Sequence, residues 1–315
     1  MDSNFEFFDY KNYNKKNICI KELISKKLKI ESSQFEIEAL EDIASISQLF
    51  SKEIPFSNFE LIGGNLNFDI DTIVNCIQNK GGRCLHLNIA LGLLLTEFGI
   101  KVHLVKAIEE SPYNIYDIFR FHYGNVFKWR DGRYYFHDVG LGYFNHYYPI
   151  EIGNETPIEG YSKSLPPSLF RVIENNNNNY GPDKKYILQK KLINNNTQEE
   201  NDFISVFEFK FKEKITFQAI IERSSRFIKS PYCFPVASIL REEGYYFLAN
   251  NSLTIFSPSN SKSITKINDI EQFEMILLKH FNLDIRLFKF FKKEENHFEC
   301  QANIDANRLI NSNIN

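Results

Sequence analysis

Residues 80–88 of the 315-residue chain read KGGRCLHLN, and the rest of the chain can be interpreted around them. Two glycines precede Cys84, and the chain then stays largely apolar over 85–98, before Gly99 provides a helix stop signal. This pattern predicts a buried helix with Cys84 in its first turn. The unpaired N–H groups of a helix start and the charge of Arg83 favour a thiolate, so we expect a lowered thiol pKa. The alternative is that Cys84 packs as a small hydrophobic residue.

Helical patterns also precede this segment. Ser33 and Glu36 form a capping box, and apolar residues follow at helical spacing. Asp69 is a candidate N-cap for a second helix with the same periodicity. Together with the Cys84 helix, these patterns predict a helical bundle over residues 1–98.

Beyond the predicted bundle the pattern changes to short β-rich segments, and residues 121–139 are typical of a hairpin. Aromatic and β-branched residues flank an Asp-Gly turn at 130–132. A three-residue loop with Gly132 in the left-handed conformation pairs Trp129 with Arg133. This loop length fixes the register of the two strands.

The predicted register decides which polar side chains share a face. It places Gly124 opposite Asp138, so that His122 and Asp138 project from one face as diagonal neighbours, about 7–8 Å apart at the backbone. A two-residue loop would put them on opposite faces, and Asp138 could instead cap the turn that follows it. His137 points to the other face, so we expect it at the surface or behind the site.

Composition narrows the class of protein. With 43% hydrophobic residues, the chain is long enough for two or three packed domains. The formal net charge of -3 gives no field that would collect nucleic acid or a membrane surface. No apolar run approaches membrane-spanning length, and the N-terminus has no basic region followed by an apolar one, so we expect a cytoplasmic protein.

The cysteines are scattered and odd in number, and no two form a CxxC pair. This distribution favours neither a disulfide framework nor a metal site. The five cysteines are Cys19, Cys76, Cys84, Cys233 and Cys300.

The remaining chain divides by pattern. Beyond Pro149 it is loop-rich, and it contains asparagine tracts at 175–179 and 194–196 that we interpret as surface insertions. Strand and helix patterns then resume, and the simplest grouping is a mixed α/β domain over 206–315. The middle domain covers residues 99–205.

Four segments taken together resemble the arylamine N-acetyltransferase family. They are IPFSNF at 54–59, KGGRCLHLN at 80–88, His122 on its strand and DVGLG at 138–142. The separations of Cys84 from His122 (122 - 84 = 38) and of His122 from Asp138 (138 - 122 = 16) are close to those of that family. Weaker likenesses at 170–172 and 225–228 extend the resemblance over most of the chain.

The resemblance implies an α+β protein of three domains with the boundaries given above. A helical bundle would carry Cys84, a β-barrel would carry His122 and Asp138, and an α/β lid would follow. The three side chains would form a papain-like site between the first two domains.

The resemblance also implies a ping-pong acetyltransferase that requires no metal. Acetyl-CoA would acylate Cys84, and an aromatic amine or hydrazine would then take the acetyl group while His122, held by Asp138, removes its proton. Ser224 and Ser225 are implied as contacts of CoA. The alternatives are a thiol hydrolase or transglutaminase-like acyl transfer with the same triad, and a degenerate member that only binds.

Three positions depart from the family pattern. Lys80 replaces an arginine and loses its bidentate fork, and Ser57 replaces a glutamate. Leu141 stands where an aromatic ring is common. By analogy Leu141 would line the acceptor pocket, so a different acceptor preference is expected.

Overall fold

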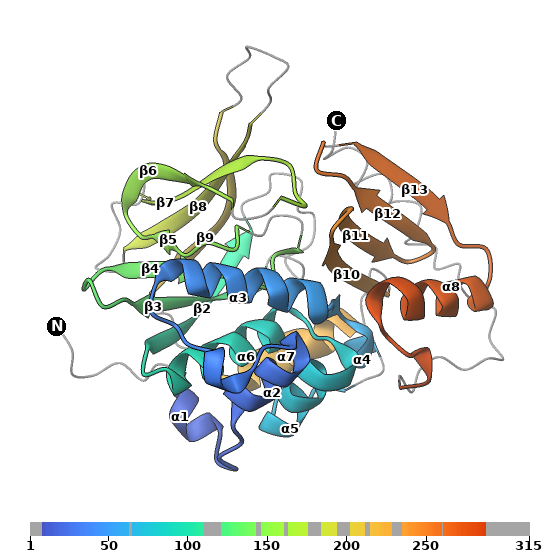
Figure 1. The fold of residues 1–315 in the computed structure, drawn as a ribbon, viewed down its shortest axis with the longest axis horizontal. Coiled ribbons are helices and arrows are strands. Elements are labelled where there is room, and N and C mark those ends of the chain that lie inside the picture. The colour runs from blue at the N-terminus through green and yellow to red at the C-terminus, as the bar shows by residue number, and fades with distance from the viewer. Residues whose placement is uncertain are drawn as a thin grey trace.

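The structure is a computed structural model that describes residues 8–62, 65–109, 121–142, 146–160, 163–175, 184–193, 202–211, 215–228, 235–259 and 261–287. Its elements form a mixed helix and sheet architecture (Figure 1). A layer of helices packs against an eight-stranded sheet, and a five-stranded sheet with a C-terminal helix of its own lies beside them.

The helical layer is built around one apolar helix. Every residue of that helix, α6, is buried from 85 to 95, which explains its apolar sequence on all sides. The helices of the layer are α1 (Tyr10–Tyr13), α2 (Ile20–Leu28), η1 (Ser32–Gln34), α3 (Leu40–Glu53), α4 (Phe59–Ile62), α5 (Ile70–Asn75), the π-helical turn η2 (Cys76–Lys80), α6 (Cys84–Glu97) and α7 (Phe217–Ile228).

The two predicted helix starts in this layer have different outcomes. Asp69 caps α5 by accepting a hydrogen bond from the backbone N of Thr72 at 2.8 Å, as predicted. The prediction that a capping box at Ser33 opens a helix is wrong, because α3 begins only at Leu40. There the Asp42 carboxylate accepts from the backbone N–H groups that precede the helix.

The eight-stranded sheet has the order β5-β4-β3-β2-β9-β8-β7-β6. Its edge strands, β5 and β6, follow each other in the chain, and a bridge joins Ile152, next to β5, to Val172 on β7, so the sheet is a nearly closed barrel. The strands are β2 (Lys101–Glu109), β3 (Phe121–Lys128), β4 (Tyr134–His137), β5 (Ile150–Glu151), β6 (Asn154–Glu159), β7 (Ser168–Glu174), β8 (Lys185–Leu192) and β9 (Ile204–Lys210).

The hairpin of β3 and β4 has the predicted register. Trp129 N donates to Arg133 O at 2.9 Å, and Gly132 has a φ of +85°. The ladder continues to the pair Asn125 and His137, where β4 ends. Asp138 therefore lies one residue beyond the strand.

The smaller sheet combines one strand from the N-terminal part of the chain with four strands from its C-terminal part. Its order is β1-β10-β11-β12-β13, and β1 comes from the IPFSNF segment, with Phe56 opposite Ser238. Its elements are β1 (Phe56–Ser57), β10 (Val236–Arg241), β11 (Gly244–Ala249), β12 (Ser252–Phe256), β13 (Lys262–Lys266), α8 (Ile270–Ile276), the π-helical turn η5 (Leu277–Phe281) and η6 (Ile285–Leu287).

Two elements from the segment 206–315 lie with the earlier parts of the chain. Strand β9 pairs with β2 and β8 inside the eight-stranded sheet, so the predicted boundary at 205/206 runs through this strand. Helix α7 lies among the N-terminal helices, and its Ile220 packs in their core (Figure 1). Cys233, Cys300 and most of both asparagine tracts lie outside the described residues. Within the described ranges, no helix has the length and apolar composition needed to span a membrane.

Candidate active site

Cys84 is the first residue of α6 and follows a tightly packed glycine turn. Gly82 N donates to Pro55 O at 3.1 Å, and Ser57 N donates to Gly82 O at 3.0 Å. Gly81 has a φ of +62°, and a Cβ there would lie 2.2 Å from the Pro55 oxygen. Only glycine fits this turn without displacement. The segments 54–59 and 80–88 thus pack directly against each other.

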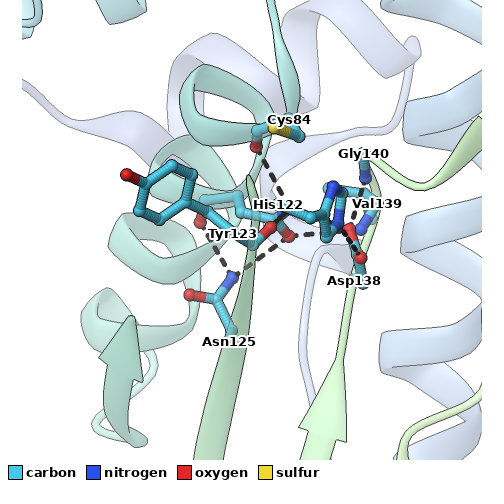
Figure 2. Close-up of polar contacts among 8 residues, drawn as sticks. Cys84, His122, Tyr123, Asn125, Asp138, Val139 and Gly140 are labelled. Atoms are coloured by element: carbon cyan, nitrogen blue, oxygen red, sulfur yellow. Dashed lines mark hydrogen bonds and ion pairs between the residues drawn. The ribbon is translucent and has the colours of Figure 1, made fainter. Parts of the chain in front are cut away.

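His122 and Asp138 meet as the hairpin register predicts. The Nε2 atom of His122 is hydrogen-bonded to Oδ2 of Asp138, and the Asp138 side chain is completely buried. The imidazole also stacks on Phe207, with ring centroids 5.4 Å apart. Figure 2 shows His122, near the start of strand β3, directed toward Asp138. These contacts fix both the position and the plane of the imidazole.

Cys84 lies against the same two residues. Gly140 passes so close that a Cβ there would be 2.5 Å from Cys84 Cα, which brings the turn after Asp138 onto the start of α6. The Cys84 side chain is half-buried, and His122 acts on it strongly enough to lower the thiol pKa. Because Asp138 occupies Nε2 of the ring, Nδ1 is the nitrogen left for the thiol.

The electrostatics of this site favour an ion pair. Burial alone would raise the pKa of Cys84, but the charge and hydrogen bond of His122 outweigh it, so the thiol pKa lies below its ordinary value. Burial alone would lower the pKa of His122, but Asp138 and then Cys84 raise it to about 10. Between these pKa values the stable form is a thiolate beside an imidazolium.

The Asp138 carboxylate, the third group of the site, is ionised in this arrangement. Burial opposes the charge of Asp138, but His122 and hydrogen bonds from Asn88 and Gly140 lower its pKa below the ordinary value. The two hydrogen bonds reach the same oxygen, Oδ1, over 2.8 Å from Asn88 Nδ2 and 2.6 Å from Gly140 N. The other oxygen remains for His122.

Asn88 is a site residue that sequence reasoning missed. Its fully buried Nδ2 also donates to Tyr123 O at 2.6 Å and to Cys84 O at 3.1 Å, while its Oδ1 accepts from Val139 N at 3.2 Å. Its position four residues after Cys84, on the same face of a helix, was the signal that could have indicated it.

The two serines implied as CoA contacts lie on α7, with different surroundings. Ser224 is buried, and its hydroxyl accepts from Arg83 Nη1 at 3.0 Å, so α7 reaches the residue next to Cys84. Ser225 donates to Ile221 O at 2.9 Å within the same helix. Their contact with CoA stays a prediction.

The three departures from the family pattern have defined contacts. Leu141 is half-buried beside Gly140 and packs on the barrel interior. Lys80 forms an ion pair with Glu60, and both side chains are largely buried. The Ser57 hydroxyl accepts from Phe59 N at 3.3 Å.

His137 lies behind the site, which is one of the two positions expected for it. It points to the face opposite Asp138, as expected, and its side chain is completely buried rather than at the surface. Helix α3 covers this face, and Nε2 of His137 is hydrogen-bonded to Ser47 Oγ at 2.6 Å. The ring is therefore part of the packing between α3 and the hairpin.

Known proteins can be compared with this geometry. The sequence profile described as N-acetyltransferase matches residues 39–290. The chain belongs to the arylamine N-acetyltransferase family. It is similar to a probable arylamine N-acetyltransferase of Dictyostelium discoideum, with 28% identity over 111 residues that cover 34% of this chain and 36% of that protein. An uncharacterized acetyltransferase of Acanthamoeba polyphaga mimivirus is 32% identical over 130 residues, or 39% of this chain and 61% of that protein. The chain thus spans less than two thirds of either curated relative.

Solved arylamine N-acetyltransferases share the fold. The Bacillus cereus enzyme, which has a Cys-His-Glu catalytic triad, superposes with a TM-score of 0.67 and 19% identity, covering 85% of this chain and 99% of that one. The Mycobacterium marinum enzyme in complex with CoA gives a TM-score of 0.64 and 14% identity, covering 84% and 93%. In the present arylamine N-acetyltransferase family member, the acid beside His122 is an aspartate.

Proposed function

We propose that the protein transfers an acetyl group from acetyl-CoA to an aromatic amine through an acetyl-Cys84 intermediate. The observation that carries this proposal is the His122–Asp138 pair set against a half-buried thiol with a lowered pKa, in a member of an acetyltransferase family. A thiolate is the nucleophilic form of cysteine, so the lowered pKa increases the fraction of the first reactant that is present at neutral pH.

The proposed first step acylates the protein. The Cys84 thiolate attacks the thioester carbonyl carbon, the bond from that carbon to the CoA sulfur breaks, and His122 imidazolium gives its proton to the departing CoA thiolate. The first-turn N–H groups of α6 have no partner within the helix and would stabilise the oxyanion. Asp138 keeps the imidazole in one orientation throughout.

The proposed second step returns the thiolate. The amine nitrogen attacks the acetyl carbon, the carbon–sulfur bond to Cys84 breaks, and His122 removes the proton from the nitrogen. Hydrazines have the same nucleophilic nitrogen and are included as acceptors. Leu141, beside Gly140, would border the acceptor.

The binding of CoA is a further part of the proposal. We assign α7 as one side of its site, because Ser224 contacts Arg83 immediately before Cys84. We also propose that the helical layer, the barrel and the smaller sheet act as three domains, and that the protein works in the cytoplasm, where its thiol stays reduced.

Intact-mass spectrometry after mixing with acetyl-CoA tests the first step. The protein should gain one acetyl group, and Cys84→Ser should gain none, while Cys76→Ser serves as a control that still becomes acetylated. An adduct that persists in Cys84→Ser would contradict the proposal.

The fate of the adduct separates transfer from hydrolysis. Adding an arylamine, and in parallel an arylhydrazine, to the isolated acetyl-protein should remove the acetyl group much faster than buffer does. Equal rates with and without the amine would instead favour the thiol hydrolase alternative.

A further inference from the structure

A chain of buried polar groups runs from the N-terminal helix α1 to the residues around Cys84. We propose that Tyr10 and Asn125 are positioning residues that hold α6 against β3, and thereby hold Cys84 at its working distance from His122. The inference rests on the proposed function in taking the Cys84 sulfur as the reacting atom.

Asn125 connects the strand of His122 to the helix of Cys84. It lies three residues after His122 on β3, so its side chain leaves the opposite face of the sheet and meets α6. The side chain is completely buried, and its Nδ2 donates to Asn88 O at 2.8 Å. Asn88 lies one helical turn after Cys84, so this bond fixes the two elements close to the reacting pair.

Tyr10 determines which way the Asn125 amide faces. The Tyr10 hydroxyl donates to Asn125 Oδ1 at 2.7 Å. An amide has its acceptor on one side and its donors on the other, so this bond directs Nδ2 toward the Asn88 carbonyl. Loss of the hydroxyl leaves a buried Oδ1 without this donor and removes the preference for that orientation.

The Tyr10 ring packs against Gly92 within the helical layer. A Cβ at Gly92 would lie 2.3 Å from Cζ of Tyr10, so the glycine in the middle of α6 admits the ring. The Tyr10 side chain is buried, and burial raises its pKa well above the ordinary value. The hydroxyl therefore stays protonated and keeps donating.

The chain ends on the Asp138 carboxylate. Asn88, whose carbonyl is held by Asn125, uses its own Nδ2 to reach Asp138 Oδ1. Figure 2 shows Asn125 on the same strand as His122, with dashed bonds in the space between strand and helix. Movement of α6 along β3 would therefore change the Cys84–His122 contact and the Asn88–Asp138 bond together.

Tyr10→Phe tests this inference, with Tyr135→Phe as its matched control. Both changes remove only a hydroxyl, and both rings are buried. Tyr135 donates instead to Asp131 Oδ2 at 2.8 Å, at the tip of the hairpin. The measurement is the iodoacetamide alkylation rate of Cys84 across a pH series, resolved by mass spectrometry, together with the melting temperature.

We expect Tyr10→Phe to slow alkylation of Cys84 about fivefold at pH values below the wild-type thiol pKa, with recovery at high pH, because a looser contact with His122 raises that pKa. Tyr135→Phe should lower the melting temperature by a similar amount but leave the pH profile unchanged. Asn125→Leu should shift the alkylation pH profile of Cys84 in the same direction and by a larger amount. If this variant does not fold, the result for Tyr10→Phe alone tests the inference.

An unchanged pH profile in Tyr10→Phe would overturn the inference, whatever happens to its stability. The alkylation measurement needs no acetyl-CoA, so it also separates the two proposals. A wild-type protein that alkylates at low pH but never becomes acetylated contradicts the proposed function and leaves the positioning intact. If the wild-type protein becomes acetylated normally but the alkylation pH profile is unchanged in Tyr10→Phe, the proposed function stands and the positioning role is contradicted.

Discussion

Cys76 and Cys84 lie eight positions apart in the same helical layer, yet their thiols have opposite properties. Burial raises the pKa of Cys76 to about 12, and Glu60 adds to the effect, while Arg83 and Lys80 only partly oppose it. Cys84 also feels burial and the same Arg83, but its pKa is lowered. Nearby cations are therefore not sufficient to activate a buried thiol in this protein.

The difference comes from a partner that can hold a charge at hydrogen-bonding distance. Cys84 has His122, which Asp138 keeps protonated, whereas the cation nearest to Cys76 in sequence, Lys80, is already paired with Glu60. Cys76 packs instead against the glycine turn, with its Sγ 3.3 Å from the place where a Cβ of residue 82 would be.

The largest expected effect is the contrast in alkylation itself. Near pH 7 only about 10⁻⁵ of Cys76 would be thiolate, against more than about 10⁻² of Cys84, so Cys84 should react with iodoacetamide at least about 10³ times faster. As the pH rises, the rate at Cys76 should climb toward about pH 12, while that at Cys84 levels off once its lowered pKa is passed. Site-resolved mass spectrometry measures both. Equal alkylation rates of Cys76 and Cys84 at neutral pH would contradict the difference between the two thiols.

Asp138→Asn should make Cys84 behave more like Cys76. Without the carboxylate the pKa of His122 falls, the thiolate loses its counter-charge, and acetylation by acetyl-CoA should slow about a thousandfold. Stopped-flow measurement of CoA release reports the rate. Asp131→Asn, on the exposed hairpin tip, is the control and should acetylate normally. A loss in both variants would point to misfolding of the hairpin instead.

Gly140→Ala tests the position of Cys84 without touching an ionisable group. The added methyl group would meet Cys84 Cα at 2.5 Å, so the start of α6 must shift away from His122, and acetylation should slow about ten- to a hundredfold. Gly160→Ala makes a comparable contact, 2.9 Å from the Phe170 ring in the barrel, and should cost stability only. Wild-type rates in Gly140→Ala would show that this packing does not set the geometry.

The smallest effect on the reaction should come from Cys76→Ser. Its hydroxyl would be buried at a position built for a thiol, so the free energy of unfolding should fall by about 1–2 kcal/mol while acetylation stays within about twofold. Denaturant titration checks the first value. Cys19→Ser is the control, because Cys19 is exposed and its replacement should leave stability unchanged. A large loss of acetylation in Cys76→Ser would give Cys76 a role beyond packing.

Local patterns predicted much of the site. The helix that begins at Cys84 and the three-residue loop at 130–132 both depend on residues close in sequence, and the loop alone placed His122 and Asp138 on one face. Turn chemistry and side-chain alternation act over a few residues, so they can be read from the chain directly.

The predictions that failed or were left open depended on distant contacts. The Ser33 box does not start an α-helix: Ser33 lies in the 3₁₀ turn η1, residues 35–38 have no regular structure, and Arg130 donates to the Ile37 and Glu38 carbonyls there, at 2.9 and 3.3 Å. For His137 the sequence left the surface and a position behind the site open, because alternation gives the face of a strand but not what covers it. Packing of α3 decided that it is buried.

The sequence was enough to name the thiol, the imidazole and the carboxylate, and to predict that two of them share a face. It could not indicate how α6 is held against β3, because the bond from Tyr10 to Asn125 joins residues 115 positions apart. Nor could it show that β9 enters the eight-stranded sheet between β2 and β8. Short-range geometry follows from backbone sterics at each turn, whereas the pairing of buried polar groups is decided when distant segments exclude water together.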